Sequence, residues 1–176
     1  LSSDKDFLQC CDDKTIIYQP IKKKFVTRKT ILEDHKIHPN NFALARSMAG
    51  DKSDNLPGVQ GIGMGTILKK LPFLSEERSY TIQELIDYCD QYPEDRMLQK
   101  ISNGKEQITK GYKIMQLYSP NISYQTQQRV RYSIDNYPKH FSKTFVLKMM
   151  IEDGINVGNW NDLFTFYKRL KLTQED

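Results

Sequence analysis

The chain has 176 residues, of which 38% are hydrophobic and 27% are charged. That length and composition are typical of one compact domain or two small ones, and they exclude a largely disordered chain. No apolar run approaches the roughly 18 residues that a membrane span needs, so we expect no membrane partner. The net charge is +4, from 26 basic and 22 acidic residues, which by itself favours a nucleic-acid partner only weakly.

The first predicted elements are a strand end, a short helix and a hairpin. Residues 1–3 read as the end of a strand, after which Asp6 can cap a short helix. Because a parallel strand needs neighbours on both sides, further strands are expected before residue 1. Two β-rich runs, at 15–18 and 24–27, lie around Pro20 and predict a hairpin.

Helices are predicted for most of the remaining chain. Residues 30–35 form at least one turn, and Asn40 can cap a helix that Gly50 ends. The glycines of 51–65 exclude a regular element, and a helix resumes at 66–71. The later predicted helices begin with a Thr81–Glu84 capping box and continue at 94–102, 105–118, 142–152 and 161–171. The sequence therefore predicts a mainly α structure with a small β fragment.

The cysteines, Cys10, Cys11 and Cys89, form neither a CxxC pair nor a series of even spacings. This pattern argues against a disulfide scaffold or a zinc ribbon and predicts a reducing, intracellular setting, which we take to be the cytoplasm. The histidines lack a matching cysteine pair, so we predict that they are structural or surface residues.

Two aspartates stand two residues apart in the run SSDKDFLQ, which begins at Ser2. Where a strand gives way to a helix, Asp4 and Asp6 can direct both carboxylates into the crevice at the carboxyl end of a sheet. Ligand sets made of oxygen atoms suit Mg2+ or Mn2+. The alternative is structural: Asp6 caps a helix and Asp4 is solvated.

The second informative run is GDKSDNLPGVQGIG, which begins at Gly50. Asp51 and Asp54 stand three residues apart after a helix, so they could share a face and join Asp4 and Asp6 around a metal. The glycines between two helices have the character of a helix–hairpin–helix, whose backbone N–H groups approach DNA phosphates without reading base sequence. The alternative is a plain turn between helices.

With their order and spacing, the two runs resemble the 5′-nuclease family. That family includes flap endonucleases, the 5′→3′ exonuclease domain of bacterial DNA polymerase I, and the phage exonucleases also called phage ribonuclease H. The resemblance covers residues 1–72 well, and it implies the C-terminal portion of an α/β 5′-nuclease (PIN-like) fold. We expect the end of the nuclease core with a hairpin at 1–36, a helix–hairpin–helix (helix–three-turn–helix) motif at 37–75 and a helical C-terminal region at 76–176.

The resemblance also implies the activity. Family members are two-metal phosphodiesterases, so we expect a structure-specific 5′→3′ exonuclease or flap endonuclease of phage type that acts in replication or repair. By motif position Asp4, Asp6, Asp51 and Asp54 match one carboxylate cluster for Mg2+ or Mn2+, with two ions in the complete enzyme. The other cluster and the arch that threads the 5′ end are expected upstream, so this chain would hold half of the active site.

The hairpin is the expected interface with duplex DNA. The residues predicted to contact DNA there are Lys52, Gly58, Gly61, Gly63, Gly65, Thr66, Lys69 and Lys70. Family members often carry a basic residue soon after the second glycine of GIG, where this chain has Met64. Lys69 and Lys70 follow one turn later and could replace it.

Two further contacts are expected around the hairpin. Val59 and Ile62 should anchor the turn in the core, and family turns often hold a monovalent cation, usually K+, through carbonyls near Leu56, Val59 and Ile62. Lys22, Lys23 and Lys24 are predicted to form a basic ribbon that faces the DNA, although a solvated hairpin explains the same residues.

A rival hypothesis is a non-catalytic helix–hairpin–helix module that binds duplex DNA. The aspartates favour the nuclease, because carboxylates beside phosphate repel it unless a metal intervenes. A third hypothesis makes the chain part of a polymerase polypeptide, although no polymerase motif is visible after Leu71. The expected partners are duplex DNA with a 5′ flap, nick or RNA primer, and replication proteins such as a single-strand-binding protein or a sliding clamp.

Overall fold

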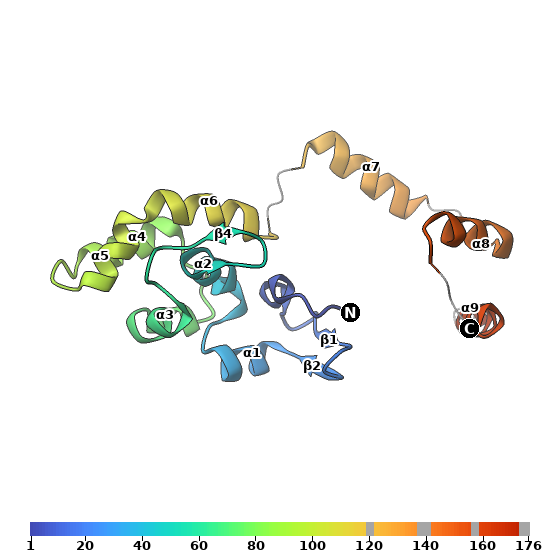
Figure 1. Ribbon diagram of the computed structural model, residues 1–176, viewed down its shortest axis with the longest axis horizontal. Helices are drawn as coiled ribbons and strands as arrows, with labels where there is room; N and C mark the ends of the chain where they lie inside the picture. Colours follow the sequence, from blue (N-terminus) through green and yellow to red (C-terminus); the bar gives the residue numbers. More distant parts are fainter. Residues whose placement is uncertain (119–121, 137–141, 156–158, 173–176) are drawn as a thin grey trace. The chain divides into compact units, whose positions relative to one another are not determined.

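The computed structural model divides the chain into two units, Leu1–Asn121 and Ile122–Asp176 (Figure 1). It describes residues 1–118, 122–136, 142–155 and 159–172. The predicted segments 1–36 and 37–75 both lie within the first unit, so their boundary is not tested and stays a prediction.

Helix α2 (Pro39–Ala49) forms the centre of the first unit. Every residue from Asn41 to Met48 is buried, which is typical of a helix that other elements surround. The elements that pack against it are the 3₁₀ helices η1 (Lys5–Cys10) and η2 (Pro72–Ser75) and the helices α1 (Arg28–His35), α3 (Met64–Lys70) and α6 (Lys105–Met115). The helices expected at 30–35, around 41–49, at 66–71 and at 105–118 are therefore confirmed.

The cap of α2 differs from the prediction. His38, not Asn40, is the N-cap, and its Nδ1 accepts the Asn40 N–H at 3.2 Å. Pro39 then occupies the first turn, where its fixed φ suits a helix and its missing N–H costs nothing. Asn40 is inside the helix, and its side chain donates to the Glu77 carbonyl at 2.6 Å.

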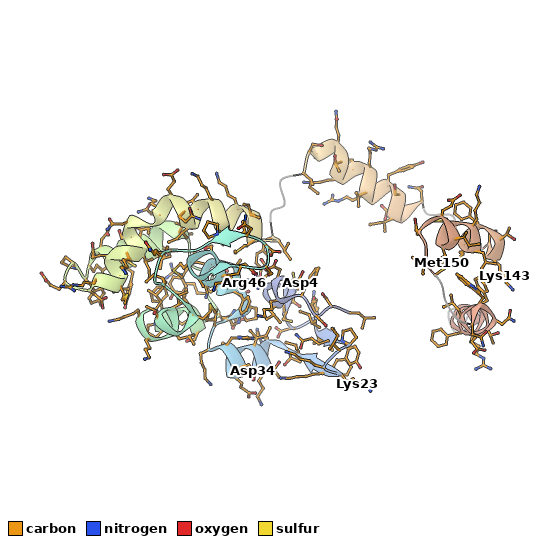
Figure 2. All side chains as sticks on the ribbon, in the orientation of Figure 1. Asp4, Lys23, Asp34, Arg46, Lys143 and Met150 are labelled. Carbon is orange, nitrogen blue, oxygen red and sulfur yellow. The ribbon has the colours of Figure 1, made fainter. Side chains whose placement is uncertain are left out.

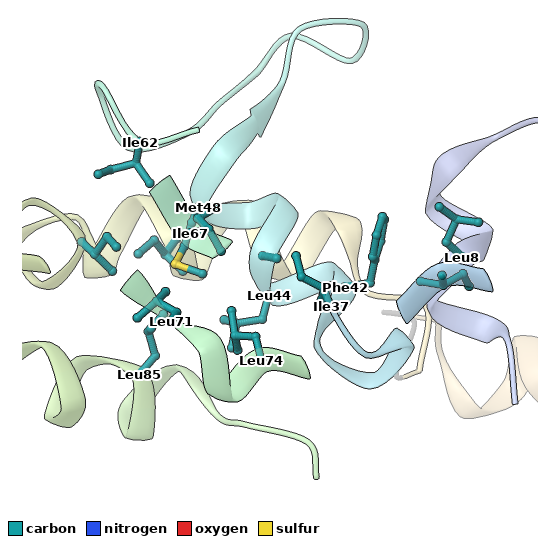
Figure 3. Packing of buried hydrophobic residues seen from close by; sticks show 14 of the residues in the cluster. Leu8, Ile37, Phe42, Leu44, Met48, Ile62, Ile67, Leu71, Leu74 and Leu85 are labelled. Carbon is teal, nitrogen blue, oxygen red and sulfur yellow. The ribbon is translucent and has the colours of Figure 1, made fainter. Parts of the chain in front are cut away.

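The hydrophobic core runs along α2 and joins it to α3. Figure 3 shows Ile67 of α3 close to Met48 of α2, with Leu71, the residue after α3, and Leu44 of α2 in the same cluster. Ile67 and Met48 are both fully buried. Leu85 extends the core into helix α4 (Ile82–Asp90), so the turn between α2 and α3 begins and ends on packed helices.

Helices α4 and α5 (Arg96–Asn103) pack against each other and against α6, and they contribute Leu85, Cys89, Leu98 and Ile101 to the core. The predicted capping box at the start of α4 is confirmed: Thr81 Oγ1 accepts the Glu84 N–H at 3.1 Å, and the Glu84 carboxylate accepts the Thr81 N–H at 2.8 Å. The helix predicted at 94–102 is α5, which Asp95 caps.

The small sheets are both antiparallel hairpins. Strands β1 (Ile17–Gln19) and β2 (Lys24–Val26) confirm the predicted hairpin, and Ile17 lies opposite Val26 with both side chains buried. Strands β3 (Gly50–Asp51) and β4 (Leu56–Pro57) form the second pair, immediately after α2.

The expected strand at residues 1–3 is not formed. The Ser2 N–H donates to the Tyr18 carbonyl at 3.0 Å, but Leu1 is 96% exposed. A strand needs a ladder of hydrogen bonds to a neighbour, and the described residues offer this segment no such ladder.

The second unit contains helices α7 (Tyr124–Asp135), α8 (Lys143–Glu152) and α9 (Trp160–Leu172). Helices α8 and α9 confirm the predictions for 142–152 and 161–171, and Lys143 lies over the Phe164 ring at 5.1 Å (Figure 2). Helix α7 was not predicted, and it has no buried residue. None of the helices in the described ranges is long and apolar enough to span a membrane.

Candidate active site and nucleic-acid interface

The first aspartate motif folds as a capped 3₁₀ helix, with the two roles reversed from the structural alternative. Asp4, not Asp6, is the N-cap of η1, and its Oδ1 accepts the Asp6 N–H at 2.9 Å. Asp4 is exposed, whereas Asp6 lies in the first turn and is directed toward α2. Because Asp4 caps η1, the Asp6 carboxylate is not needed at the helix start and can contact residues of other elements.

Arg46 joins the two aspartate motifs. Its guanidinium lies 3.3 Å from Asp6 Oδ1 and also contacts Asp51 Oδ2, and its side chain is only 10% exposed. Arg46 is labelled in Figure 2 where α2 meets the segment that begins at Asp4. Asp6 and Asp51, two of the four aspartates predicted to cluster, thus both contact Arg46.

Arg46 was not among the site residues predicted from the sequence, although a signal for it was present. It is the charged residue in a helix that otherwise buries Phe42, Leu44, Ala45 and Met48. Buried arginines are almost always paired. An arginine on such a helix, one turn before Gly50-Asp51, therefore indicates a carboxylate partner.

The second aspartate motif places Asp51 and Asp54 in different local structures. Asp51 lies in β3, and its Oδ1 accepts hydrogen bonds from the Ser53 N–H at 2.8 Å and the Ser53 hydroxyl at 2.5 Å. Asp54 lies in the exposed turn between β3 and β4. Within the described ranges, no three carboxylate, imidazole or thiol groups converge on one possible metal position, so the four-aspartate cluster stays a prediction.

The chemistry of the paired carboxylates fits a divalent cation. Asp6 Oδ1 is buried and has no hydrogen-bond partner among the described residues, although Arg46 lies near it. The Arg46 guanidinium supplies a positive charge 3.3 Å from this oxygen, but the oxygen receives no hydrogen bond from the described residues, which is costly for a buried carboxylate. Oxygen donors of this kind are the preferred ligands of Mg2+ and Mn2+.

A pocket of about 260 Å³ opens beside this pair. Its lining includes Arg46, Asp51, Gly50, Lys5, Lys52, His35, Phe42, Ala49 and Met64. Burial lowers the pKa of His35, and the nearby lysines lower it further, whereas Asp34 opposes them. Lys5 and Lys52 are exposed residues of the lining, and their positive charges would attract a negatively charged ligand to the pocket.

The turn after α2 depends on two glycines that pack backbone to backbone. A Cβ on Gly58 would lie 2.3 Å from the Ala49 carbonyl carbon, and one on Gly50 would lie 2.3 Å from the Gly58 nitrogen. Gly50 also has φ +77°. Gly58, which we predicted to contact DNA, is therefore required first for the fold of the turn.

The other glycines of the motif, Gly61, Gly63 and Gly65, are exposed. A Cβ on Gly63 or Gly65 would meet no heavy atom of the described residues within 4 Å. Gly61 has φ +79°, and a Cβ there would lie 3.2 Å from Lys100 Nζ. This surface is free for close approach of a ligand, and it adds Lys100 of α5, which the sequence did not point to, to the basic residues beside the turn.

The anchors of the turn are where the sequence placed them. Ile62 is 4% exposed, and Val59 packs against the core, with its Cγ2 2.7 Å from the position of a Cβ on Gly104. The Val59 N–H donates to the Met48 carbonyl at 2.8 Å, and the Val59 carbonyl accepts the Ile62 N–H at 3.0 Å. The predicted cation at the carbonyls of Leu56, Val59 and Ile62 is not tested by these contacts.

The predicted basic residues differ in how free their charge is. Lys52 and Lys69 are exposed. Lys70 contacts the Asp95 carboxylate, and that hydrogen bond lowers the pKa of Asp95. Lys70 is thus paired within the fold and only partly exposed, and it lines a cleft of about 270 Å³ together with Gly65, Thr66, Lys69 and Met97.

The predicted ribbon at Lys22, Lys23 and Lys24 forms the turn and second strand of the β1–β2 hairpin. All three lysines are exposed. Lys24 pairs with Asp34 at 3.0 Å, and this contact lowers the pKa of Asp34. Lys22 and Lys23 are the members of the ribbon at the tip, where Lys23 adopts φ 49°.

Comparisons with curated proteins find relatives that are nucleases or carry a nuclease domain. The chain is 32% identical over 108 residues to the thermostable DNA polymerase I of Thermus filiformis, covering 61% of the chain and 12% of that polymerase. It is 23% identical over 118 residues to the 5′-3′ exonuclease of Aquifex aeolicus, covering 67% of the chain and 38% of that enzyme. The chain therefore spans well under half of either relative. No family model matches it.

Solved structures give the same fold. The T5 5′-exonuclease with bound zinc matches with a TM-score of 0.53 and 19% identity, covering 65% of this chain and 41% of that one. A bacteriophage T5 flap endonuclease in a pseudo-enzyme-product complex with DNA and metal ions matches with a TM-score of 0.51 and 19% identity, covering 65% and 40%.

These likenesses define the class of fold. The chain has the fold of the C-terminal portion of a PIN-like 5′-nuclease, mostly helical with small sheets. The resemblance drawn from the two aspartate motifs is confirmed, since the homologues are 5′-3′ exonucleases and the 5′-nuclease domains of DNA polymerase I. The hypothesis of a polymerase polypeptide stays untested, because the match covers 12% of that polymerase.

Proposed function

We propose that this chain is the C-terminal portion of a divalent-metal-dependent 5′→3′ exonuclease and flap endonuclease that hydrolyses phosphodiester bonds. The observation that carries the proposal is the meeting of Asp6 and Asp51 at Arg46, directly beside the glycine-rich turn. The names of the relatives, 5′-3′ exonuclease and flap endonuclease, support the same reaction class.

Asp6 and Asp51 are the residues that would hold a divalent cation, with Asp4 and Asp54 as proposed further ligands. Bound Mg2+ or Mn2+, two ions in the complete enzyme, supplies activation of water and neutralisation of charge on the leaving oxygen. This chain's own part is to hold carboxylate oxygens at the edge of the pocket. The Ser53 N–H and hydroxyl, which both donate to Asp51 Oδ1, fix the orientation of that carboxylate.

The turn between α2 and α3 would bind the backbone of duplex DNA. Gly61, Gly63 and Gly65 leave room for phosphates to approach the main chain. The basic and polar residues proposed around them are Lys52, Thr66, Lys69 and Lys70, with Lys22, Lys23 and Lys24 on the hairpin. Because such contacts go to phosphate, they would select the structure of the DNA and not its base sequence.

The substrates in this proposal are duplexes with a 5′ flap, a nick or an RNA primer, which fit a role in replication or repair in the cytoplasm. The neighbour solved with DNA and metal ions supports a DNA substrate. A K+ ion at the carbonyls of Leu56, Val59 and Ile62 would strengthen the turn as a phosphate site. A single-strand-binding protein or a sliding clamp is the proposed protein partner.

The DNA-binding part is tested by placing a side chain on the open face of the turn. Gly63→Val should keep the fold, because its Cβ meets no neighbour within 4 Å, but it should fill the space that a phosphate needs. We expect affinity for two duplexes of unrelated sequence, measured by fluorescence anisotropy, to fall by about tenfold for both.

The matched control is Gln83→Val, which places the same side chain at an exposed position of α4, outside the glycine-rich turn. It should leave duplex affinity unchanged. Duplex binding of Gly63→Val at the level of this control would refute the proposed role of the turn. A loss for one duplex but not the other would show readout of base sequence, which the proposal excludes.

A further inference from the structure

Arg46 occupies the position where the two proposed ligands Asp6 and Asp51 meet. It reaches them from the last turn of α2, while Asp6 comes from η1 and Asp51 from β3. The arginine carries one positive charge between two carboxylates. The cluster therefore keeps an excess of negative charge, and one of its oxygens, Asp6 Oδ1, lacks a hydrogen-bond partner among the described residues.

An arginine cannot give up this position by losing a proton, because its guanidinium stays charged at any pH at which a protein is folded. The carboxylates become available to another cation only when the guanidinium moves. The pocket of about 260 Å³ that Arg46 lines gives it a direction in which to move without unfolding α2.

We propose that Arg46 is the resident counter-ion of the Asp6–Asp51 pair and competes with the divalent cation for it, so that Arg46 sets the affinity of the site. The proposal rests on the proposed function, since it takes Asp6 and Asp51 as ligands of that cation. Arg46 is a positioning residue in this account: it holds the two carboxylates together and screens their repulsion until a divalent cation replaces its contacts.

A purely structural ion pair makes a different prediction. A buried arginine that only stabilises α2 would destabilise the whole chain when removed, and the distorted carboxylates would then bind a cation more weakly. A competing counter-ion predicts the opposite sign, because its removal leaves two carboxylates with no cation beside them. Cation affinity thus separates the two roles.

The experiment titrates the chain with Mn2+ and follows free Mn2+ by electron paramagnetic resonance. Arg46→Met keeps an unbranched apolar stem and removes the guanidinium charge, and we expect it to tighten Mn2+ binding by about tenfold or more. Arg46→Lys keeps a charge with fewer donors, and we expect an affinity between those of the parent and Arg46→Met.

Arg28→Met is the matched control, because Arg28 also bridges two carboxylates, Asp13 at 2.7 Å and Glu77 at 2.9 Å, on the surface of the same unit. We expect it to leave Mn2+ affinity unchanged. If Arg46→Met binds Mn2+ no more tightly than the parent does, the counter-ion role is wrong while the metal site stands. If neither binds Mn2+, both the site and the inference fail.

A second measurement does not depend on the folding of a variant. In the parent chain, saturation with Mg2+ should shift the Arg46 Nε–H resonance and speed its exchange with water, and the Arg28 resonance should stay in place. Asp51→Asn should abolish that response. An Arg46 resonance that is unmoved at saturating Mg2+ would overturn the inference, even if Asp51→Asn showed that Mg2+ binds at the pair.

Discussion

Asn41 is fully buried in α2, yet both polar atoms of its side-chain amide have partners. Its Nδ2 lies 2.9–3.2 Å from the carbonyls of Leu74, Glu76 and Arg78, and its Oδ1 accepts the Tyr80 N–H at 3.0 Å. One side chain therefore holds the segment between η2 and α4 against the central helix. Satisfied buried amides of this kind fix one conformation, because every alternative leaves a polar group unpaired.

The first prediction follows from this contact. Asn41→Leu should lower the free energy of unfolding by about 2–4 kcal/mol, because it leaves the Tyr80 N–H and the facing carbonyls without their partner. The measurement is urea denaturation at neutral pH. Asn40→Ala is the control, since Asn40 bonds Glu77 in an exposed position and should cost less than about 1 kcal/mol. Equal losses would contradict the account.

The second prediction concerns pH. Burial lowers the pKa of His38, Glu77 opposes that shift and Arg28 adds to it. The unfolded chain therefore takes up a proton at a higher pH than the folded chain does. His38 contributes its full stabilisation above the unfolded pKa of about 6.5, and this is lost as pH falls toward the lower folded pKa.

Protonation would also remove the Nδ1 lone pair that caps α2. His38→Asn keeps a capping acceptor without a titrating group, so the decline in unfolding free energy between about pH 7.5 and about pH 5.5 should become shallower than in the parent. A residual slope from His35, whose pKa burial also lowers, is expected in both. An unchanged slope in His38→Asn would show that His38 is not the group that titrates.

Residue spacing identified the aspartates of the candidate site but not their roles. Asp4 and Asp6 both lie near the start of a helix, and either could cap it. The hydrogen bond of 2.9 Å from the Asp6 N–H to Asp4 Oδ1 identifies Asp4 as the cap. The role of Arg46 was not predicted, although Arg46 is the charged residue of an otherwise uncharged helix. Its partners lie in η1 and β3, and no local pattern connects those segments.

Among the elements, the turn between α2 and α3 shows how similar glycines differ in purpose. Gly58 lies against the main chain of Ala49 and Gly50, whereas Gly63 faces open space. The motif string predicted a glycine-rich turn correctly. It could not tell a glycine that the fold requires from one that leaves room for a ligand, because that depends on which backbone segments cross.

The third prediction uses that difference. Gly58→Ala should lower the free energy of unfolding by about 1–3 kcal/mol or more, since its Cβ would overlap the main chain at 2.3 Å. Gly63→Ala should change it by less than about 0.5 kcal/mol. Urea denaturation of the two variants is the measurement. Comparable stability of both would contradict the packing described for the turn.

Elements with strong local signals were predicted well. The α4 start was predicted because Thr81 and Glu84 satisfy each other's backbone donors within one turn. Helix α7 was missed because it buries none of its residues, so no apolar stripe marked its sequence. The prediction of a strand at residues 1–3 was wrong for a different reason. A strand forms only where a neighbouring strand accepts and donates its hydrogen bonds, and the residues of the strand do not specify that neighbour.

At the scale of the whole molecule, the fold brings two distant motifs to one place. Helix α2 lies between η1 and the β3–β4 pair, so its last turn contacts both. The sequence predicted that the motifs meet, through the resemblance and through the chemistry of clustered carboxylates. It could not predict that an arginine would stand between them, because that depends on the angle at which η1 packs on α2.

The central claim is that Asp51 holds a cation for phosphodiester hydrolysis beside a surface that binds duplex DNA. The fourth prediction concerns the full-length protein with Asp51→Asn, which retains an Oδ1 to accept the Ser53 hydrogen bonds. Because a metal ligand acts on the transition state more than on docking, turnover of a 5′-labelled flap duplex should fall at least about a hundredfold while duplex affinity changes little.

Asp87→Asn, on the exposed face of α4, removes one carboxylate charge outside the two aspartate motifs. It retains an Oδ1 to accept the Gln83 hydrogen bond, so this variant should cleave the flap duplex at the parent rate. The most direct measurement is therefore the cleavage rate of the flap duplex by these two variants, with duplex affinity measured alongside. The account predicts a severe loss of turnover for Asp51→Asn alone. Cleavage by Asp51→Asn within about threefold of the Asp87→Asn rate, with duplex binding intact, would contradict it and leave a DNA-binding module without catalysis at this site.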